Sequence, residues 1–375
     1  MFHIMRATVV KEVVKENILI DDALFVDQWG RSKRKLRISV TDRCNFKCVY
    51  CMPEHPEWMN KKDLLSFEQL YQFCDFMVRR GIESIRITGG EPLMRQGVVH
   101  FIAQLQSLRA LGLKRISMTS NAHYLKTYAQ ALKQAGLDDI NISLDSLDAI
   151  QFKQLTQKEL APVLEGIAAA KKVALPIKIN SVLMQGINDD QIIPLARWAI
   201  QQKISLRFIE FMPLDGDQHW SRAQVVSEQQ ILDCLSTVFR VSHAATSNSD
   251  PARQYTIDGH SIGIISTVSH SFCAECDRLR LTAQGEFYNC LFATKGLMLK
   301  AYIEALTLKP TAHLAASFTI NSMNAKLYSP QMQLQQILSD YIWHKEAGFH
   351  AIQQRLKNQS PDKSSRKISM HMLGG

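Results

Sequence analysis

The sequence predicts an α/β fold in which short parallel strands alternate with amphipathic helices. Six runs rich in aliphatic and β-branched residues occur between residues 37 and 211, and stretches with helical periodicity separate them. Polar or glycine-containing turns follow most strand candidates, as in repeated βα units. Six such units are compatible with a partial barrel of the TIM type or with a doubly wound sheet. Both folds bind ligands outside the carboxyl ends of the strands.

The strand candidates are Arg37–Val40, Ile85–Thr88, Arg115–Met118, Ile140–Leu144, Ile177–Leu183 and Leu206–Phe211. Helices are predicted over Val98–Leu111, Tyr124–Ala135, Pro162–Ala174, Asp190–Gln201 and Glu228–Phe239. A further helix begins at a capping box formed by Ser66 and Gln69. Cys74 and Cys234 stand on apolar helix faces, so we predict that both are core residues. Asp27–Gly30 is predicted to form a turn.

The last third of the chain contains a predicted hairpin. Segment 242–251 is small and polar, which predicts a linker, and Ile262–Val268 is a strand candidate. Strand patterns at Arg278–Thr282 and Glu286–Leu291 flank a turn centred on Gln284. Folding about Gln284 sets position 278 opposite position 290.

The composition is that of an ordinary globular protein. The chain has 375 residues, of which 46% are hydrophobic and 21% charged, so two domains or one large barrel with an appendage are expected. No apolar run approaches a membrane span, and the N-terminus lacks the apolar region of a signal peptide. Six of the eight cysteines fall into two tight clusters, which favours metal ligation in a reducing cytoplasm over disulfides.

The net charge of +9 does not decide between nucleic acid and an anionic small molecule. Basic residues are spread along the chain, and the run Arg31–Arg37 is typical of a solvated approach to a strand. Six basic residues are expected within strands, where an unpaired charge is costly. They are Arg37, Arg86, Lys178, Arg207, Arg278 and Arg280. Arg37, Arg86 and Arg207 flank strand ends, where a side chain can point to solvent, but a set this large on barrel-facing strands otherwise needs anionic partners such as a triphosphate.

The first cysteine cluster is Cys44, Cys48 and Cys51, spaced C-x3-C-x2-C directly after a strand candidate. Three thiolates can hold an iron–sulfur cube and leave one of its four irons without a protein ligand. A structural zinc site is the alternative, but zinc normally takes four protein ligands. His55 follows across Pro53 and is poorly placed to be the fourth. The spacing therefore predicts an iron–sulfur cluster with an open iron.

The second cluster is Cys273, Cys276 and Cys290, and the predicted hairpin brings Cys290 back beside the other two. The same two interpretations apply, with His270 as a candidate outside ligand if the metal is zinc. Arg278 and Arg280 next to an open iron favour a substrate pocket.

Several motifs together resemble one family. The stretches LRISVTDRCNFKCVYCMP, RITGGEPLMR, NISLDSLD, LRFIEFMPL, FCAECDRLRLT and CLF, with the terminal Gly374-Gly375, are similar to the GTP 3′,8-cyclase family of radical S-adenosylmethionine enzymes in molybdenum cofactor biosynthesis. The likeness runs from about Asp27 to Phe292 and resumes at the last two residues. Its most specific part is the second cysteine cluster joined to Arg-Leu-Arg.

The resemblance implies a partial (β/α)6 TIM-type barrel with a C-terminal domain that carries a second iron–sulfur cluster. The expected parts are an N-terminal extension over 1–30, the radical SAM barrel over 31–240, the auxiliary-cluster domain over 241–345 and a tail over 346–375 that ends in Gly-Gly. The implied reaction converts GTP to (8S)-3′,8-cyclo-7,8-dihydroguanosine 5′-triphosphate.

The resemblance also implies the site. Two [4Fe-4S] clusters would be held by Cys44, Cys48 and Cys51 and by Cys273, Cys276 and Cys290. S-adenosylmethionine would be contacted by Gly90, Thr119, Ser143, Met212 and Tyr50. GTP would be gripped by Arg37, Arg86, Lys178, Arg207, Arg278 and Arg280. Catalytic roles would fall to Arg278, Arg280, Gly374 and Gly375.

The partners implied are the substrate GTP, cyclic pyranopterin monophosphate synthase as the next enzyme, a flavodoxin- or ferredoxin-type electron donor and a second copy of the chain. Nucleic acid and membrane are not expected. Three positions depart from the family pattern: Ser84 replaces a lysine, Ala122 a glycine and Asp277 an asparagine. The segment from about 311 to 368 matches only loosely.

Two alternative functions remain at this point. A radical enzyme that modifies peptides also carries auxiliary cysteine clusters, but it does not need the Arg-Leu-Arg pair or a terminal Gly-Gly. A zinc-stabilised basic nucleic-acid binder would show salt-dependent binding, but the chain lacks a concentrated basic patch.

Overall fold

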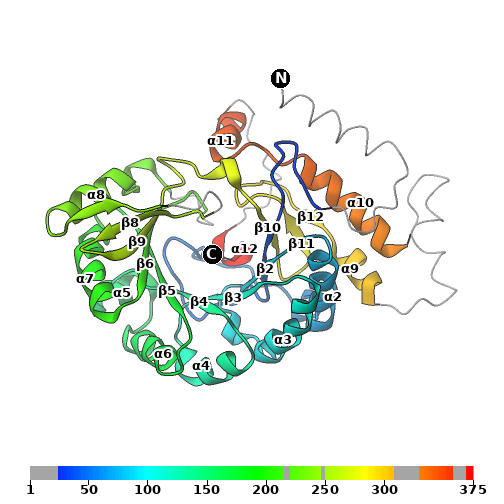
Figure 1. Cartoon of the computed structure of the whole chain (residues 1–375), viewed down its shortest axis with the longest axis horizontal. Helices are drawn as coiled ribbons and strands as arrows, with labels where there is room; N and C mark the ends of the chain where they lie inside the picture. The colour runs from blue at the N-terminus through cyan, green and yellow to red at the C-terminus, as the bar shows by residue number, and fades with distance from the viewer. Residues whose placement is uncertain (1–23, 215–219, 246–249, 308–328, 358–368, 375) are drawn as a thin grey trace.

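The computed structural model describes residues 24–214, 220–245, 250–307, 329–357 and 369–374. Its centre is a curved sheet of parallel strands surrounded by helices (Figure 1). The first six strands pair in chain order, and all six lie within a residue or two of their predicted positions. They are β1 (Lys35–Ser39), β2 (Ser84–Thr88), β3 (Arg115–Ser120), β4 (Asp139–Ser143), β5 (Ile177–Leu183) and β6 (Ser205–Glu210). A doubly wound sheet would reverse its strand order in the middle, so the partial barrel is confirmed.

Two later strands extend this parallel sheet at its ends. β10 (Arg278–Leu281) pairs with β1, and β9 (His260–Ile265) pairs with β6. Antiparallel strands follow on both sides: β11 (Glu286–Tyr288) and β12 (Leu297–Met298) beyond β10, and β8 (Arg253–Ile257) and β7 (Val241–His243) beyond β9. No strand pair in the described ranges joins the two ends, so the barrel stays open.

The predicted linker at 242–251 is partly wrong, because residues up to His243 belong to β7. The predicted hairpin is confirmed. Arg280 faces Tyr288 and Leu281 faces Phe287, a register that is centred on Gln284. Position 278 therefore lies opposite position 290, as the sequence suggested.

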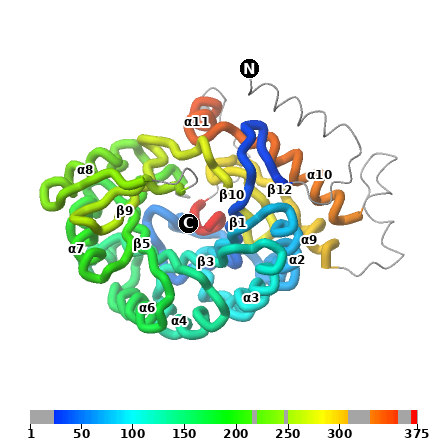
Figure 2. Tube along the Cα trace, viewed as in Figure 1, coloured from blue at the N-terminus to red at the C-terminus, as the bar shows by residue number. Residues whose placement is uncertain are grey.

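The helices cover the outer face of the barrel (Figures 1 and 2). They are α2 (Phe67–Val78), α3 (Val98–Leu105), α4 (Leu125–Gln134), α6 (Ala161–Lys172), α7 (Ile192–Gln202) and α8 (Glu228–Ser236). The capping box at α2 is confirmed, since Gln69 N donates to Ser66 Oγ and Ser66 N donates to Gln69 Oε1. The sequence missed α5 (Ala149–Thr156), which begins at its cap Asp148. With only two turns, α5 gives a weak periodic signal.

The hydrophobic core lies between the strands and these helices. Strand residues such as Ile38, Ile87 and Phe208 are fully buried, and the alternate strand positions face the barrel interior. Cys74 is a core residue as predicted, but Cys234 is only half-buried at the edge of the core.

The C-terminal part adds helices beside β10–β12. α9 (Lys300–Thr307) packs on α2, α10 (Pro330–Trp343) packs on α9, and α11 (Phe349–Lys357) follows. The last element, α12 (Met370–Leu373), lies inside the barrel against β1 (Figure 1). The predicted turn at Asp27–Gly30 is present, with Gly30 N donating to Asp27 O at 2.9 Å. Within these ranges, no helix is long and apolar enough to cross a membrane.

Glu228 fixes α8 to the strands of the open edge. Its buried carboxylate accepts hydrogen bonds from Tyr255 Oη at 2.5 Å, Ser266 Oγ at 2.7 Å and Arg253 Nη1 at 2.8 Å. Burial alone would raise the pKa of Glu228, but these donors outweigh it and lower the pKa. The carboxylate therefore stabilises the fold in its charged form.

We expect Glu228→Gln to lower the free energy of unfolding by about 3 kcal/mol at neutral pH, because buried donors lose their charged acceptor. Because the folded pKa is lowered, this stabilisation is present above the ordinary value of 4.5 and is lost as the pH falls further. Anaerobic urea unfolding from pH 7 down to pH 4 would measure it. Glu159→Gln, which removes an exposed ion pair with Lys153, is the control and should change little.

Candidate active site

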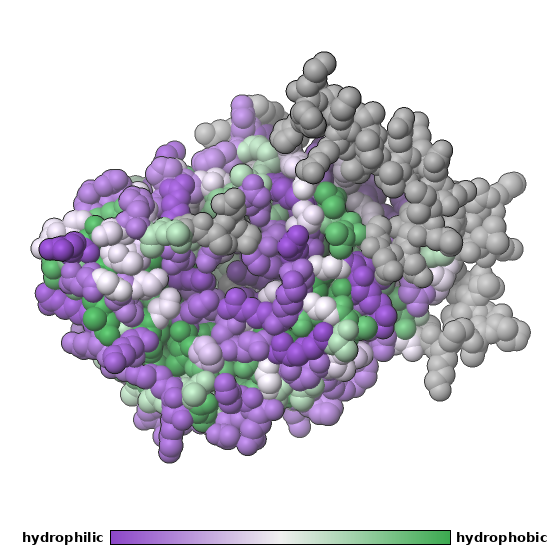
Figure 3. Space-filling model, viewed as in Figure 1, coloured by the Kyte–Doolittle hydropathy of each residue, from purple (hydrophilic) through white to green (hydrophobic). Residues whose placement is uncertain are grey.

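A cavity of about 460 Å³ runs through the barrel interior and opens on the face shown in Figure 3, where hydrophilic side chains dominate. It collects most of the predicted site residues: Arg37, Cys44, Cys48, Tyr50, Cys51, Arg86, Gly90, Thr119, Ser143, Lys178, Arg207, Met212, Arg278 and Arg280. Gly374 and the second cysteine triad lie outside this lining, and Gly375 lies outside the described residues.

The first cysteine triad (Cys44, Cys48 and Cys51) lies on the loop that leaves β1. The loop after β2 packs against it, with Gly90 N donating to Thr41 O at 2.8 Å. A Cβ atom at Gly90 would lie 2.4 Å from Arg43 O, so only glycine permits this approach. On the other side, the end of α5 accepts from the loop, since Val49 N donates to Leu155 O at 3.1 Å. The helix that the sequence missed therefore helps to position the cysteines.

Two buried carboxylates brace the loops around the first triad, and sequence reasoning had assigned neither a role. Asp145 accepts from Tyr50 Oη at 2.6 Å and from Val182 N at 2.8 Å, and burial raises its pKa to about 6. Glu91 accepts from Asn121 N at 2.8 Å and Ser120 Oγ at 2.9 Å, and burial raises its pKa to about 7. Each carboxylate joins the loop after one strand to a neighbouring loop or strand.

The thiols of the first triad fit an iron–sulfur cluster. Burial raises the pKa of Cys44 to about 12, and the nearby Glu91 adds to the effect. Burial also raises the pKa of Cys48 and of Cys51, helped by Asp145. Thiolates here therefore need a cation to be stable, and metal ions deprotonate the thiols that ligate them. The three cysteines line the cavity and would leave one iron of a cube without a protein ligand.

The other half of the cavity is strongly basic. Eight Lys and Arg residues line the cavity, against the three acids Asp145, Glu210 and Asp250. Arg280, Arg37 and Arg86 occupy one register level across β10, β1 and β2, so three cations lie side by side. Such a surplus favours a multiply charged anion as ligand.

The lowered pKa values of these three arginines also favour an anionic ligand in the cavity. Burial lowers the pKa of Arg86 and of Arg280 to about 10 each. Burial, followed by the charges of Arg280 and Arg86, also lowers the pKa of Arg37. An anion between them would relieve both the desolvation and the mutual repulsion.

The basic residues lie deeper than the sequence suggested. Arg37 and Arg86 are the third residues of five-residue strands, and Arg278 is the first residue of β10. The site is therefore not confined to the carboxyl ends of the strands. Because side chains at alternate positions face inward along an open barrel, the cavity continues to the strand beginnings.

Sequence reasoning missed Lys35, whose run of basic residues was interpreted as a solvated approach. Lys35 lines the cavity and lies in register between Arg278 and Ser84. Its ammonium is 3.0 Å from the carboxylate of Asp277, so one departure from the family pattern is charge-balanced by Lys35. A second departure from the family pattern, Ser84, is flanked by Lys35 and Arg115 on the neighbouring strands.

The third departure has a conformational consequence. Ala122 has a φ of 62°, a left-handed conformation that glycine adopts freely, and its side chain is fully buried. The alanine is accommodated in the same turn at some cost in strain.

The last described residues of the chain, 370–374, reach the cavity and contact Arg280. Arg280 Nη1 donates to Gly374 O at 2.7 Å and to Leu373 O at 3.1 Å. His371 and Met370 line the cavity. Gly374 has a φ of 75°, and a Cβ atom there would lie 2.0 Å from Thr88 Cγ2. The glycine is therefore required for this docking.

The second cysteine triad (Cys273, Cys276 and Cys290) lies outside the cavity lining, next in sequence to the lining residues Arg278 and Arg280. Burial alone would raise the pKa of Cys276, but Arg278, Lys345 and Lys33 lower it to about 5. His270, the candidate fourth zinc ligand, instead contacts Glu228 at 3.1 Å. Across the described part of the chain, no three His, Cys, Asp or Glu side chains are arranged to hold a single metal ion. Burial raises the pKa of Cys290, so the thiol of Cys276 is the one that its surroundings favour as a thiolate. Three cysteines without a fourth protein ligand suit a second cluster with an open iron.

Comparisons with known proteins show the family to which the chain is related. The chain matches the Radical SAM superfamily over residues 38–199 and the family Molybdenum Cofactor Synthesis C over residues 204–351. The GTP 3′,8-cyclase of Streptomyces coelicolor is 43% identical over 290 residues, which cover 75% of this chain and 84% of that protein. The GTP 3′,8-cyclase of Pseudomonas putida is 41% identical over 287 residues, which cover 75% and 85%.

Among solved structures, Streptococcus suis SuiB bound to S-adenosylmethionine has a TM-score of 0.56 at 14% identity. The match covers 90% of this chain and 80% of that one. At this identity the likeness shows a shared fold alone.

Gly374→Ala should release the docked chain end, because the added methyl group collides with Thr88. We expect amides in 370–374 to exchange with deuterium at least about tenfold faster, equivalent to about 1.4 kcal/mol of local opening. Gly30→Ala is the matched control, since Gly30 also has a positive φ but no atom within 4 Å of its Cβ position. Unchanged protection in Gly374→Ala would show that the collision is avoided.

Proposed function

This chain belongs to the GTP 3′,8-cyclase family of radical SAM enzymes, and we propose that its barrel cavity holds GTP between the two cysteine triads. The resemblance found in the motifs is confirmed. The protein is a radical SAM GTP 3′,8-cyclase of molybdenum cofactor biosynthesis that uses S-adenosylmethionine and two [4Fe-4S] clusters. One observation carries the proposal: a single cavity has the first triad at one end and eight cations against three acids along its walls.

The first triad would bind one cluster and leave one iron for S-adenosylmethionine. When bound, the reduced cluster and this cofactor supply the radical chemistry of the reaction. Gly90 would offer its backbone carbonyl to the cofactor after β2, since its amide already donates to Thr41 O. Thr119, Ser143 and Met212 would contact the cofactor from neighbouring strand ends. Tyr50 would lie beside it, held by Asp145.

GTP would lie along the rest of the cavity with its triphosphate on the basic wall. Arg37, Arg86 and Arg278 would bind phosphate oxygens from one side, and Lys178 and Arg207 from the other. These phosphate contacts would orient the ribose toward the first triad, and the bound nucleoside would exclude water from that triad. Arg280 would hold the chain end near Gly374 as well as contacting the substrate.

The second triad would hold the second cluster beside Arg278, with its open iron available to the guanine. The downstream consumer of the product would be cyclic pyranopterin monophosphate synthase. A flavodoxin- or ferredoxin-type donor would supply the electron, two copies of the chain would associate, and the reaction would take place in the cytoplasm. All eight cysteines are free, as a reducing compartment requires.

The test of this function is anaerobic turnover. The reconstituted, reduced protein should cleave S-adenosylmethionine to 5′-deoxyadenosine only when GTP is present, and it should release a cyclised nucleotide. Cleavage without dependence on GTP would favour the peptide-modifying alternative. A protein that binds zinc and no iron would contradict the proposal.

Arg278→Ala and Arg280→Ala should each lower kcat/KM for GTP by at least about 100-fold, because each removes a cation that lines the proposed anion site. Both clusters should still assemble, as judged by iron content. Arg79→Ala removes an exposed cation of α2 and should have no effect. Full activity in both cavity variants would remove these arginines from the mechanism.

Lys35→Ala should raise KM for GTP roughly five- to tenfold with little change in kcat, because Lys35 adds uniform binding to the phosphates beside Ser84. Asp277→Asn should lower KM, since it frees the ammonium from its carboxylate partner. Arg34→Ala alters an exposed neighbour that does not line the cavity and serves as the control. Equal KM values in the wild type and Lys35→Ala would assign Lys35 to the ion pair alone.

A further inference from the structure

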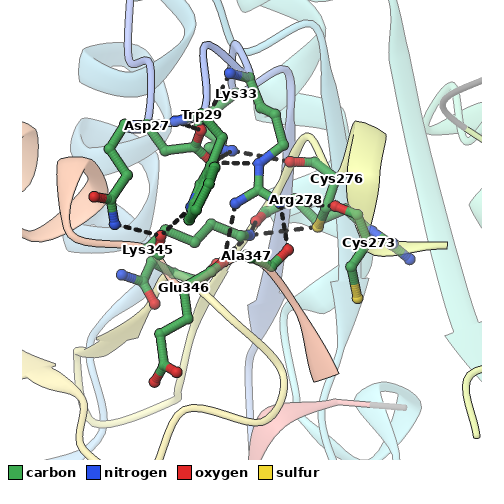
Figure 4. Close-up of polar contacts among 12 residues, drawn as sticks. Asp27, Trp29, Lys33, Cys273, Cys276, Arg278, Lys345, Glu346 and Ala347 are labelled. Carbon is green, nitrogen blue, oxygen red and sulfur yellow. Dashed lines mark hydrogen bonds and ion pairs between the residues drawn. The ribbon is translucent and has the colours of Figure 1, made fainter. Parts of the chain in front are cut away.

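Two segments outside the barrel strands lie against the loop of Cys273 and Cys276 (Figure 4). One is the turn at residues 27–33, and the other is Lys345–Ala347, just after α10. Arg31 joins them to the triad: its Nη1 donates to Cys273 O at 2.7 Å and to Ala347 O at 2.8 Å. Lys33 Nζ donates to Cys276 O at 2.9 Å. These contacts fix the backbone of two of the three cysteines.

Lys345 reaches the sulfur itself. Its Nζ lies 3.3 Å from Cys276 Sγ and 3.3 Å from Arg278 O, and it also donates to Asn289 O. An ammonium has three N–H donors, so these acceptors use all of them. Cys276 lies just before and Arg278 at the start of the first strand of the hairpin, and Asn289 lies just after the second strand. Lys345 thus ties the loop of Cys276 to the strand that leads to Cys290.

Two side chains of the turn at residues 27–33 hold the backbone carbonyl of Lys345. Trp29 Nε1 donates to Lys345 O at 3.0 Å, and Gln28 Nε2 donates to the same oxygen at 3.1 Å. The side chain is 2% exposed, so neither solvent nor a surface anion competes for the ammonium. Its position is therefore built into the fold.

The charges around the triad do not balance without an anion. Arg31, Lys33 and Lys345 are all buried, and Asp27 accepts from two of them, from Arg31 Nε at 2.7 Å and from Lys33 Nζ at 2.5 Å. The neighbouring carboxylates of Asp277 and Glu346 are paired with Lys35 and Arg355. Among the three cations and Asp27, this leaves an excess of two positive charges. An excess of buried charge is costly unless an anion lies next to it. Thiolates that ligate a cluster provide that anion at Cys276.

We propose that Lys345 is a positioning residue of the second cluster: its ammonium donates to the thiolate of Cys276, braces the hairpin around the triad and raises the cluster's reduction potential. The inference rests on the proposed function, in which this triad holds a [4Fe-4S] cluster. Reduction adds one electron to the cluster and makes it more negative. A hydrogen bond to a ligating sulfur and a nearby positive charge both stabilise that reduced form.

The test is a redox titration of the reconstituted holoenzyme with dithionite, followed by electron paramagnetic resonance. A variant in which Cys44, Cys48 and Cys51 are all changed to Ala identifies the signal of the second cluster. In Lys345→Met we expect the ratio of reduced to oxidised second cluster at a fixed potential to fall about tenfold, which is 59 mV for a one-electron couple. The first cluster should titrate as in the wild type.

Two further variants separate charge from structure. Lys345→Arg keeps the charge and should recover most of the shift. His344→Ala changes the exposed neighbour and should leave both potentials unchanged. If Lys345→Met loses the second cluster, the titration is made on Lys345→Gln, which keeps a donor but removes the charge.

An unchanged potential of the second cluster in Lys345→Met, or in Lys345→Gln where that variant is needed, would overturn the inference. Iron content of the wild type distinguishes this failure from failure of the proposed function. A wild type that binds only one cluster contradicts the proposed function. A wild type with both clusters and an unshifted variant contradicts the role of Lys345 alone.

Discussion

Positive charge buried inside the barrel is the constraint on which the rest of the structure depends. Arg37, Arg86 and Arg280 lie side by side on adjacent strands, where burial and mutual repulsion disfavour their charged forms. The sheet tolerates them because it is open and its interior is a cavity instead of a packed core. An anion that enters the cavity relieves the repulsion, so anion binding and stability of the barrel are coupled. The same surplus extends to the second triad, where the nearby cations lower the pKa of Cys276.

The sequence predicted most of the scaffold because the relevant signals are local. Alternating apolar residues located the first six strands, and glycine between two short strands located the hairpin about Gln284. Spacing predicted the first cysteine triad, and spacing together with the hairpin predicted the second. The pairings of β9 with β6 and of β10 with β1 were not predicted, because no local pattern specifies which distant strand completes an edge.

The parts of the site that the sequence did not reveal also depend on contacts between distant residues. Lys35 and Lys345 are single lysines in unremarkable contexts, and only tertiary contact reveals that one lines the cavity and the other touches a sulfur. Asp145 and Glu91 stand after strands as ordinary turn residues would, yet both are buried and hold loops together. The depth of the arginines was also misjudged, because a strand pattern gives the face of a residue but not the extent of a cavity.

The pairing of β1 with β10 has a consequence for how the chain acquires its structure. Lys33, just before β1, meets Cys276 across 243 residues, and Arg31 meets Ala347 across 316. During synthesis, β1 through β6 can pair in order while one side of β1 stays an exposed edge until the distant hairpin emerges. Exposed edges invite pairing with other chains, and contacts of such long range form slowly. The nascent protein therefore passes through an aggregation-prone stage in which chaperone binding at β1 would be most valuable.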